Sequence, residues 1–334
     1  HTLAGRPLIG YVMDAAAALE PQKTVLVLAP GMDEVAAAVP DAEVVLQEPQ
    51  LGTGHAVLAA HGALSGSTGT VLVLYGDTPL VRGQTLSDLV AACGAGPNLV
   101  VLGFRPEDAH GYGRLVVSDD GTLEAIVEHK DASDEERKIG LCNSGVMAVD
   151  GKVLFELLGK VGNDNAKGEY YLTDIVAVAR NRGLGCGIVE AASDEVLGIN
   201  SRGQLAAAEK IVQGRLRARA MAAGVTLVDP ETVYFSADTA LGRDVTVQPN
   251  VFFGPGVEVG DGASIRAFSH LEGARVSAGA QVGPFARLRP GAEIKADARV
   301  GNFVEIKKSV IEEGAKVNHL TYIGDARVGA GANI

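Results

Sequence analysis

The chain has 334 residues, of which 47% are hydrophobic and 21% charged, a composition typical of a folded protein long enough for two domains. Its net charge is −12 and it has no basic block, so we expect no nucleic-acid-binding surface. No apolar run approaches the ~20 residues of a membrane span, and no signal-peptide pattern is present. Three cysteines without metal-like spacing (Cys93, Cys142 and Cys186) favour a cytoplasmic protein with reduced thiols.

Strand-like and helix-like segments alternate in the first part of the chain. The expected strands are residues 24–30, 43–47, 70–80 and 98–104, and the expected helices are residues 7–19, 32–39 and a segment from about 53 to 61. The continuous apolar runs at 24–30, 70–80 and 98–104 predict strands buried on both faces. Such alternation predicts a parallel sheet covered by helices, with ligands beyond the carboxyl ends of the strands.

The pattern changes after Phe104. Residues 113–129 predict a hairpin around Asp120-Gly121, residues 142–150 a strand, and residues 152–158 and 171–181 helices. A helix rich in Ala and Arg is expected over residues 202–223, with Gly224 as its C-cap. We therefore expect one domain over residues 1–224, ending in this linker helix, and another over residues 225–334.

An apolar residue recurs at six-residue steps through the last part of the chain. A period of six fits neither an amphipathic helix nor a simple strand, and it predicts a parallel β-helix. One residue per hexad is expected to point inward, with glycines at the bends. The series, with three five-residue steps, is Leu241, Val247, Phe253, Val259, Ile265, Leu271, Val276, Val282, Leu288, Ile294, Val300, Ile306, Ile311, Val317, Ile323, Val328 and Ile334.

Two segments of the first domain have residue types that suit a metal ion or an anion. Asp77, in YGDTPL, follows an expected strand, where it could hold Mg²⁺ or merely cap a turn, and its position favours neither. The segment QLGTGHA (residues 50–56) has two glycines before a helix, a weak signal for anion binding.

In the β-helix, His319 lies in NHLTYIGD. It is either a surface histidine or a general base that accepts a proton from an ammonium group. The nearby basic residues form either a solvated face or a sugar-phosphate site, and they are Arg287, Arg289, Lys295, Lys307 and Lys308.

Several segments, in this order, resemble one bacterial family: QEPQLGTGHA, YGDTPL, HGYGRLV, IVEHKDAS, CNSGVMA, GEYYLTDIV and GINSRGQL, then GPFARLRPGA, VGNFVEIKK and HLTYIGDA. The family is that of the bifunctional N-acetylglucosamine-1-phosphate uridyltransferase / glucosamine-1-phosphate acetyltransferases. The resemblance covers essentially the whole chain. It implies an α/β fold, in which a Rossmann-like, GT-A-like nucleotidyltransferase domain precedes a left-handed parallel β-helix, and it implies a homotrimer.

For the first domain, the resemblance implies that UTP reacts with N-acetylglucosamine-1-phosphate. The uracil and nucleotide would be read by Gln47, Gly52 and Thr53, and Tyr75, Gly76 and Asp77 would lie along the ribose, sugar and metal. The N-acetylglucosamine part would be contacted by Gly113, Glu128 and Asn143. Asn200 would join Asp77 as a ligand of Mg²⁺.

For the β-helix, the resemblance implies acetyl transfer from acetyl-CoA to glucosamine-1-phosphate. His319 would be the general base, Arg289 and Lys307 would hold the phosphate and sugar, and Tyr322 and Asn333 would complete the acceptor site. The site would lie between adjacent β-helices of the trimer.

The sequence departs from the family's pattern at both ends. The family has a Gly-rich phosphate loop and a catalytic lysine before the HTLAG with which this chain starts, and its acetyl-CoA contacts lie beyond Ile334. We therefore expect a truncated polypeptide that is a poor uridyltransferase and lacks the donor half of the second site. Two alternatives are a single-function sugar-1-phosphate nucleotidyltransferase with a trimerising β-helix, and a non-catalytic trimeric scaffold.

Overall fold

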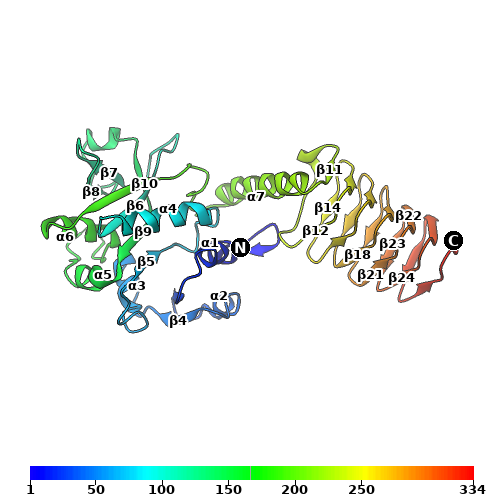
Figure 1. The fold of residues 1–334 in the computed structure, drawn as a ribbon, viewed down its shortest axis with the longest axis horizontal. Helices are drawn as coiled ribbons and strands as arrows, with labels where there is room; N and C mark the ends of the chain where they lie inside the picture. The colour runs from blue at the N-terminus through cyan, green and yellow to red at the C-terminus, as the bar shows by residue number, and fades with distance from the viewer. Residues whose placement is uncertain (166) are drawn as a thin grey trace. The chain divides into compact units, whose positions relative to one another are not determined.

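The computed structural model describes residues 1–165 and 167–334, which divide into two compact units (Figure 1). One unit comprises residues 7–204, and the other comprises residues 1–6 together with residues 205–334. None of the described helices combines the length and the hydropathy needed to cross a membrane. The three cysteines are free, as the sequence predicts, and all three are buried.

The unit of residues 7–204 is a mixed sheet flanked by helices. Its six-stranded sheet has the order β10-β6-β9-β7-β8, with β5 also paired to β9, and a separate parallel pair joins β3 to β4. Its helices are α1 (Leu8–Ala17), α2 (Asp33–Ala37), α3 (Thr53–Ala59), α4 (Gly83–Gly94), η1 (Glu136–Lys138), α5 (Gly151–Leu158), η2 (Leu172–Asp174) and α6 (Ile175–Asn181). Its strands are β3 (Val25–Leu28), β4 (Glu43–Leu46), β5 (Thr70–Val73), β6 (Leu99–Phe104), β7 (Arg114–Val117), β8 (Leu123–Val127), β9 (Cys142–Asp150) and β10 (Cys186–Glu190).

Strand β6, which has a neighbour on each edge, divides the core of this unit into two layers. Its alternate residues point to opposite faces, so Leu99 and Val101 pack in one apolar cluster while Val100 and Leu102 pack in the other. The first cluster includes buried residues of α5 and α6, and the second includes buried residues of α4. Packing on both faces of the sheet holds its strands in place, and the residues of the candidate site follow or belong to these strands.

Three details of this unit differ from the sequence-based prediction. The sheet is mixed instead of parallel, because β9 pairs antiparallel with both β5 and β6. Helix α4 and strand β10 were not predicted. Of the three strands expected to be buried on both faces, β6 is buried throughout, as predicted, whereas β3 and β5 are only half-buried. Strand β6 has a neighbour on each edge, while β3 and β5, among the described residues, each pair with one strand.

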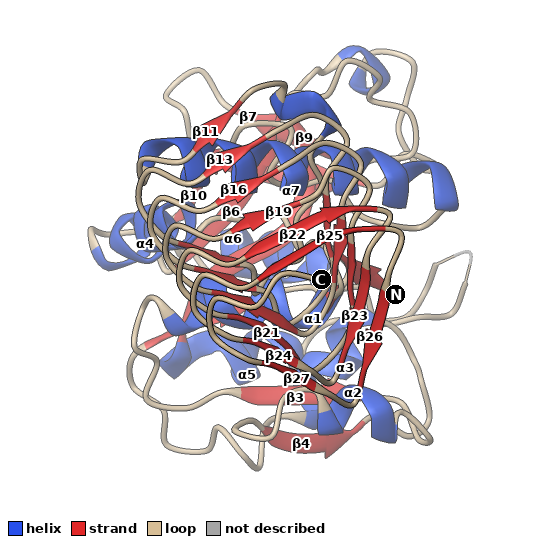
Figure 2. Ribbon diagram, turned by 90° about the vertical axis from the view of Figure 1, so that its right-hand side faces the viewer, coloured by secondary structure: helices blue, strands red, loops and turns tan. Residues whose placement is uncertain are grey.

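The second unit is a parallel β-helix with three sheets, whose strands stack as successive rungs (Figures 1 and 2). The first sheet contains β11 (Thr226–Leu227), β13 (Thr246–Val247), β16 (Ser264–Ile265), β19 (Gln281–Val282), β22 (Arg299–Asn302) and β25 (Lys316–His319). The second contains β14 (Phe252–Phe253), β17 (His270–Leu271), β20 (Arg287–Leu288), β23 (Glu305–Lys307) and β26 (Tyr322–Gly324). The third contains β12 (Ala240–Leu241), β15 (Glu258–Val259), β18 (Ala274–Val276), β21 (Ala292–Ile294), β24 (Val310–Ile311) and β27 (Arg327–Val328).

The hexad residues line the interior of the β-helix, as predicted. Those from Val247 to Val317 are buried, whereas Ile334 is exposed. In the hexads from Val247 to Val317, two residues point inward instead of the predicted one. The second stands two positions earlier, as in Ala280 and Ala298, because residues two apart on a strand share a face.

A long helix, α7 (Arg202–Ala222), is joined to the first coil by buried polar side chains. Gln213 Nε2 donates to Phe235 O at 2.7 Å, and Phe235 N–H donates back to Gln213 Oε1 at 2.9 Å. Arg217 Nε donates to Val233 O at 2.9 Å, and its guanidinium lies over the Tyr234 ring. The helix, which we expected to close the first domain, therefore groups from Leu205 onward with the β-helix.

The first residues of the chain also belong to the β-helix unit. Strands β1 (Thr2–Leu3) and β2 (Arg6–Pro7) form a two-stranded sheet, and Leu3 is fully buried. Ala4 N–H donates to the Glu209 carboxylate and Ala4 O accepts from Ala237 N–H, both at 2.8 Å. A 3₁₀ turn, η3 (Pro230–Thr232), follows β11.

One corner of the β-helix carries exposed apolar side chains, which we call the aromatic corner: Phe268, Phe285, Phe303 and Leu320. They occupy equivalent positions of successive coils, each with a positive φ of 52–59°. The Phe285 ring lies 4.9 Å from the Phe268 ring and 5.1 Å from the Phe303 ring, both stacked. About half of each phenylalanine and 75% of Leu320 remain exposed, so this apolar edge has no cover within the described chain.

Candidate functional site

A carboxylate and an amide flank one small space at the end of β5. Asp77 O accepts from Ile199 N–H at 3.0 Å, which holds residues 198–200 beside it. A Cβ at Gly198 would lie 3.4 Å from Asn200 Nδ2 and 4.0 Å from Asp77 Oδ2, so the glycine leaves that space open. Burial raises the pKa of Asp77, because its charged form has lost water. The Asp77 carboxylate suits a hard cation that takes most of its ligands from a substrate, and an asparagine side chain can add an amide oxygen as a ligand.

Tyr75 follows the end of β5 and packs against Gly145 of β9. A Cβ at Gly145, where φ is +89°, would lie 2.8 Å from Tyr75 Cε2, so only glycine fits against the ring. Burial raises the pKa of Tyr75 to about 12, the charges of Asp77 and Glu128 add to this, and a hydrogen bond with Thr53 opposes it. The phenol is therefore neutral near pH 7.

Glu128 lies beside the backbone of Gly113, which has no side chain to fill the space between them. A Cβ at Gly113 would be 3.6 Å from both carboxylate oxygens of Glu128. Thr173 Oγ1 donates to Glu128 Oε1 at 3.4 Å, and burial raises the pKa of Glu128. Asn143 N–H donates to Gly113 O and Asn143 Oδ1 accepts from Gly145 N–H, each at 2.9 Å. Asn143 is thus bonded both to Gly113 and to Gly145, and Gly145 packs against the Tyr75 ring.

The loop before α3 approaches another backbone segment closely. Gly52 has φ +107°, and a Cβ there would lie 2.7 Å from Tyr170 O. Gly54 N–H donates to the same oxygen at 2.8 Å, and Thr53 Oγ1 accepts from Leu172 N–H at 3.0 Å. The two glycines therefore serve close packing against residues 170–172.

The side chain of Gln47 folds back onto this loop. Its Nε2 lies 2.9 Å from Gly52 O and 3.2 Å from Nδ1 of His55, in the first turn of α3. His55 also lines a hollow of about 280 Å³ behind the loop, together with Leu58 and Tyr170.

The structure links most of the site residues proposed for the first domain into one region. Gln47 is bonded to Gly52, Thr53 is bonded to Tyr75, and Gly198 lies near both Asp77 and Asn200. The ten residues are Gln47, Gly52, Thr53, Tyr75, Gly76, Asp77, Gly113, Glu128, Asn143 and Asn200. Sequence reasoning did not single out His55, Gly145, Thr173 and Gly198, although each lies within a segment that carries the family resemblance.

On the β-helix, the residues proposed for acetyl transfer lie on two faces that meet at the aromatic corner. His319 is exposed at the end of β25 and lies beside Asn302 of β22. Tyr322, on β26, is 59% exposed and lies beside Glu305, across the corner from His319. Leu320 stands between the two faces, so a single chain offers a convex surface at this point.

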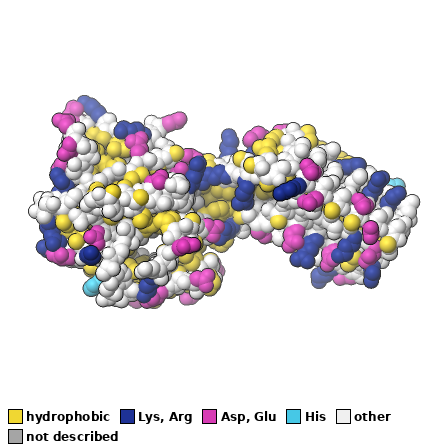
Figure 3. All heavy atoms as spheres, viewed as in Figure 1, with side chains coloured by type: hydrophobic (Ala, Val, Ile, Leu, Met, Phe, Trp, Pro, Cys, Tyr) yellow, Lys and Arg dark blue, Asp and Glu magenta, His cyan; other side chains and the backbone are white. Residues whose placement is uncertain are grey.

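Arg289 and Lys307 lie on adjacent coils, because Arg289 N–H donates to Ile306 O. Arg289 pairs with Glu305 at 2.9 Å and Lys307 with Asp325 at 3.9 Å. In Figure 3, Lys and Arg side chains likewise lie among Asp and Glu on the visible face of the β-helix. The basic residues are therefore partly neutralised, which supports neither a uniform cationic surface nor a bare phosphate site.

Asn333 lies one coil beyond His319. Its Oδ1 accepts from Asn318 Nδ2 at 2.6 Å, and Lys316 lies beside it. Asn333 thus adjoins the strand that carries His319 and is separated by the corner from Tyr322.

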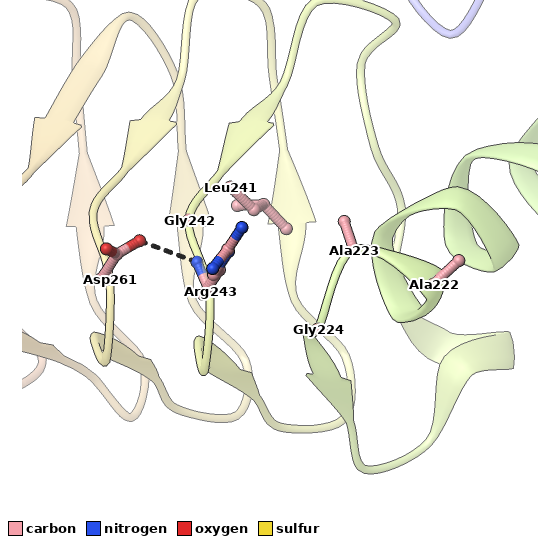
Figure 4. A pocket seen from close by; sticks show the side chains of 7 residues that line it. All are labelled: Ala222, Ala223, Gly224, Leu241, Gly242, Arg243 and Asp261. Atoms are coloured by element: carbon pink, nitrogen blue, oxygen red, sulfur yellow. Dashed lines mark hydrogen bonds between the residues drawn. The ribbon is translucent and has the colours of Figure 1, made fainter.

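Another hollow, of about 710 Å³, opens where α7 meets the first coils (Figure 4). It is lined mainly by small and apolar residues, with Arg243 and Asp261 as its charged side chains. Asp261 Oδ1 accepts from Arg243 N–H at 2.8 Å, so this carboxylate holds a turn. None of the proposed site residues lines this hollow. The described residues also contain no group of three or more His, Cys, Asp or Glu side chains that could hold a metal ion.

Comparison with known proteins identifies relatives over the whole chain. Residues 1–140 match the model of the MobA-like NTP transferase domain. The chain is 63% identical over 336 residues to the bifunctional protein GlmU of Rhodospirillum rubrum, and 55% identical over 336 residues to that of Paramagnetospirillum magneticum. It is 55% identical over 338 residues to the protein of that name from Xanthobacter autotrophicus. Each comparison covers all of this chain and 75% of the relative.

Proposed function

Because this chain belongs to the bifunctional GlmU family, we propose that it is an enzyme with two sites that together make UDP-N-acetylglucosamine. One site transfers the acetyl group of acetyl-CoA to glucosamine-1-phosphate. The other joins the resulting N-acetylglucosamine-1-phosphate to the uridylyl group of UTP. The product is a precursor for peptidoglycan and lipopolysaccharide. Three unpaired thiols accord with a cytoplasmic location.

In the uridyltransferase site, a phosphate oxygen of the sugar phosphate attacks the α-phosphorus of UTP. The bond from that phosphorus to the bridging oxygen breaks, and pyrophosphate leaves. Gln47, Gly52 and Thr53 hold the uracil end, while Gly113, Glu128 and Asn143 hold the N-acetylglucosamine. The neutral phenol of Tyr75 lies between these groups without adding charge. Positioning therefore supplies much of the catalysis.

Asp77 and Asn200 are the proposed ligands of Mg²⁺. The space that Gly198 leaves between them and the raised pKa of Asp77 support this assignment, because a cation there would offset the cost of a buried carboxylate. When bound, Mg²⁺ neutralises charge on the phosphates. This juxtaposition of Asp77 and Asn200 is the observation that carries the uridyltransferase proposal.

In the acetyltransferase site, His319 accepts a proton from the amine of glucosamine-1-phosphate as the amine attacks the thioester carbonyl of acetyl-CoA. A new amide bond forms, and the carbon–sulfur bond breaks to release CoA. Arg289 and Lys307 exchange part of their pairing with Glu305 and Asp325 for the sugar phosphate. Tyr322 and Asn333 complete the acceptor site.

We further propose that the chain forms a homotrimer through its β-helix. The aromatic corner is an exposed apolar edge of the kind that marks protein interfaces. The convex surface around His319 cannot enclose a substrate by itself, and a neighbouring β-helix would supply the missing wall.

Two assays on the full-length protein test these proposals. Pyrophosphate release is followed with UTP, Mg²⁺ and N-acetylglucosamine-1-phosphate, and CoA release is followed with acetyl-CoA and glucosamine-1-phosphate. Asp77→Ala should lower only the first rate, by more than about a hundredfold. His319→Ala should lower only the second, by about 10²–10⁴-fold.

The assays also separate the alternatives. A protein that releases pyrophosphate but no CoA would be a single-function nucleotidyltransferase. One that releases neither would be a scaffold. Loss of both activities in Asp77→Ala alone would contradict two independent sites.

A further inference from the structure

We propose that His55 is a positioning residue that fixes the orientation of the Gln47 amide, and thereby makes the base site select uracil over cytosine. This inference rests on the proposed uridyltransferase function. It adds a residue that does not itself contact the nucleotide.

The identity of the amide atoms of Gln47 follows from their neighbours. The atom 2.9 Å from Gly52 O faces a carbonyl oxygen, which can only accept, so it must be the nitrogen. The same nitrogen lies 3.2 Å from Nδ1 of His55. Its two protons are thus directed at Gly52 O and at His55 Nδ1, and the imidazole carries its own proton on Nε2.

Gly52 O also accepts from Ala56 N–H at 3.0 Å, as the first hydrogen bond of α3. The carbonyl therefore shares its acceptor capacity, and His55 supplies the second, independent acceptor for Gln47. A flipped amide would set Oε1 against both Gly52 O and Nδ1 of His55. The contact with Gly52 O would bring two lone pairs together, and the contact with His55 would do the same unless the ring proton moved from Nε2 to Nδ1. The Gly52 carbonyl therefore enforces the observed orientation, and the Nε2–H tautomer of His55 reinforces it.

With both protons engaged, Oε1 is the atom of the Gln47 amide left to read a base. Uracil presents an N3–H donor, which this oxygen accepts. Cytosine presents a lone pair at N3, which repels the same oxygen. Only a flipped Gln47 would offer cytosine a donor, and His55 opposes the flip. A site built around a fixed acceptor rejects a base that lacks the donor.

The environment of His55 keeps its ring in place for this task. It stands on α3, whose first turn is anchored by the bonds from Gly54 to Tyr170 and from Thr53 to Leu172. The His55 ring centroid lies 6.4 Å from that of Tyr170. The imidazole therefore approaches Gln47 from a fixed helix turn.

The test compares UTP with CTP as substrates of the full-length protein, through kcat/KM for pyrophosphate release. In His55→Leu, the ratio of the two values should fall about tenfold, the loss expected for one hydrogen bond. In His55→Asn, a side-chain oxygen can replace Nδ1 as acceptor, and most of the ratio should return. Because both substrates meet the same preparation, the ratio does not depend on the fraction of folded enzyme.

His61→Leu is the matched control, since the His61 ring lies 4.5 Å from the Phe155 ring, between centroids, and the two bonds of Gln47 Nε2 go to Gly52 and His55 instead. Its ratio should equal that of the wild type. An unchanged ratio in His55→Leu, or an equal fall in His55→Leu and His55→Asn, would overturn the proposal. A wild-type protein without pyrophosphate release would instead overturn the proposed function on which it rests.

Discussion

Replacing Gln213 with leucine should destabilise the junction between α7 and the first coil. Gln213 is 2% exposed and satisfies both main-chain polar groups of Phe235, the N–H at 2.9 Å and the carbonyl at 2.7 Å. Leucine fills a similar volume but leaves both groups buried without a partner. Each such group costs about 1–3 kcal/mol, so the free energy of unfolding of this unit should fall by about 2–6 kcal/mol. That is a large share of the ~5–15 kcal/mol stability of a typical domain.

The measurement is chemical denaturation of the full-length protein, followed through the transition of the β-helix unit. Two units imply more than one transition, so each is fitted separately. The control is Lys210→Leu, an exposed position on the same helix, which should change stability by less than about 0.5 kcal/mol. If Gln213→Leu costs no more than this control, the two bonds to Phe235 do not join the helix to the coil.

Three further substitutions test the site and the interface. Asp77→Asn should unfold at a higher denaturant concentration than the wild type at pH 7, because burial raises the pKa of Asp77 and penalises its charged form. This gain in stability should vanish below pH ~4, where the carboxyl is protonated in both the folded and the unfolded state, and a gain that persists there would refute this cause. Gly145→Ala should lower the rate of pyrophosphate release and reduce the free energy of unfolding by about 1–2 kcal/mol, since alanine is strained at φ +89° and would displace the Tyr75 ring. Wild-type kinetics in this variant would show that the ring contact is dispensable. Phe285→Glu should convert the proposed trimer to monomers in light scattering and reduce CoA release, and an intact trimer would exclude the aromatic corner from the interface.

The β-helix could be predicted from the sequence because its period is local. Six residues of chain determine which side chain points inward, and no distant contact is needed to recognise the pattern in Val247, Phe253 and Val259. The second inward position was missed because it is often alanine, as at Ala280, and alanine also occurs on surfaces.

Helix α4 was missed because its start depends on a residue far along the chain. The N-cap position is Arg82, whose side chain makes no capping bond. The Glu195 carboxylate instead accepts from Arg82 N–H at 3.3 Å and from the Thr85 hydroxyl at 2.6 Å. A cap supplied across 113 residues leaves no local signal.

The candidate site could be predicted only in part from the sequence, because some of its features depend on residues that are distant along the chain. The position of Asp77 after a strand is a local feature, and it could be read directly. The need for glycine at residue 145 arises only from the Tyr75 ring packed against it. The bond between Gln47 and His55 likewise depends on the turn that Gly52 makes between them.

The regular coils of the β-helix have a consequence for where its chemistry can take place. Val247 lies beside Ile265 and Ile265 beside Val282, so one coil takes 18 residues and the next 17. Each coil advances the chain by the ~4.8 Å that separates neighbouring strands. Insertion or deletion of one whole coil between Val247 and Val300 would therefore preserve every pairing register and move His319 by one such step relative to α7. The distance from this histidine to the start of the β-helix is set by the number of coils, in fixed increments that point substitutions cannot change.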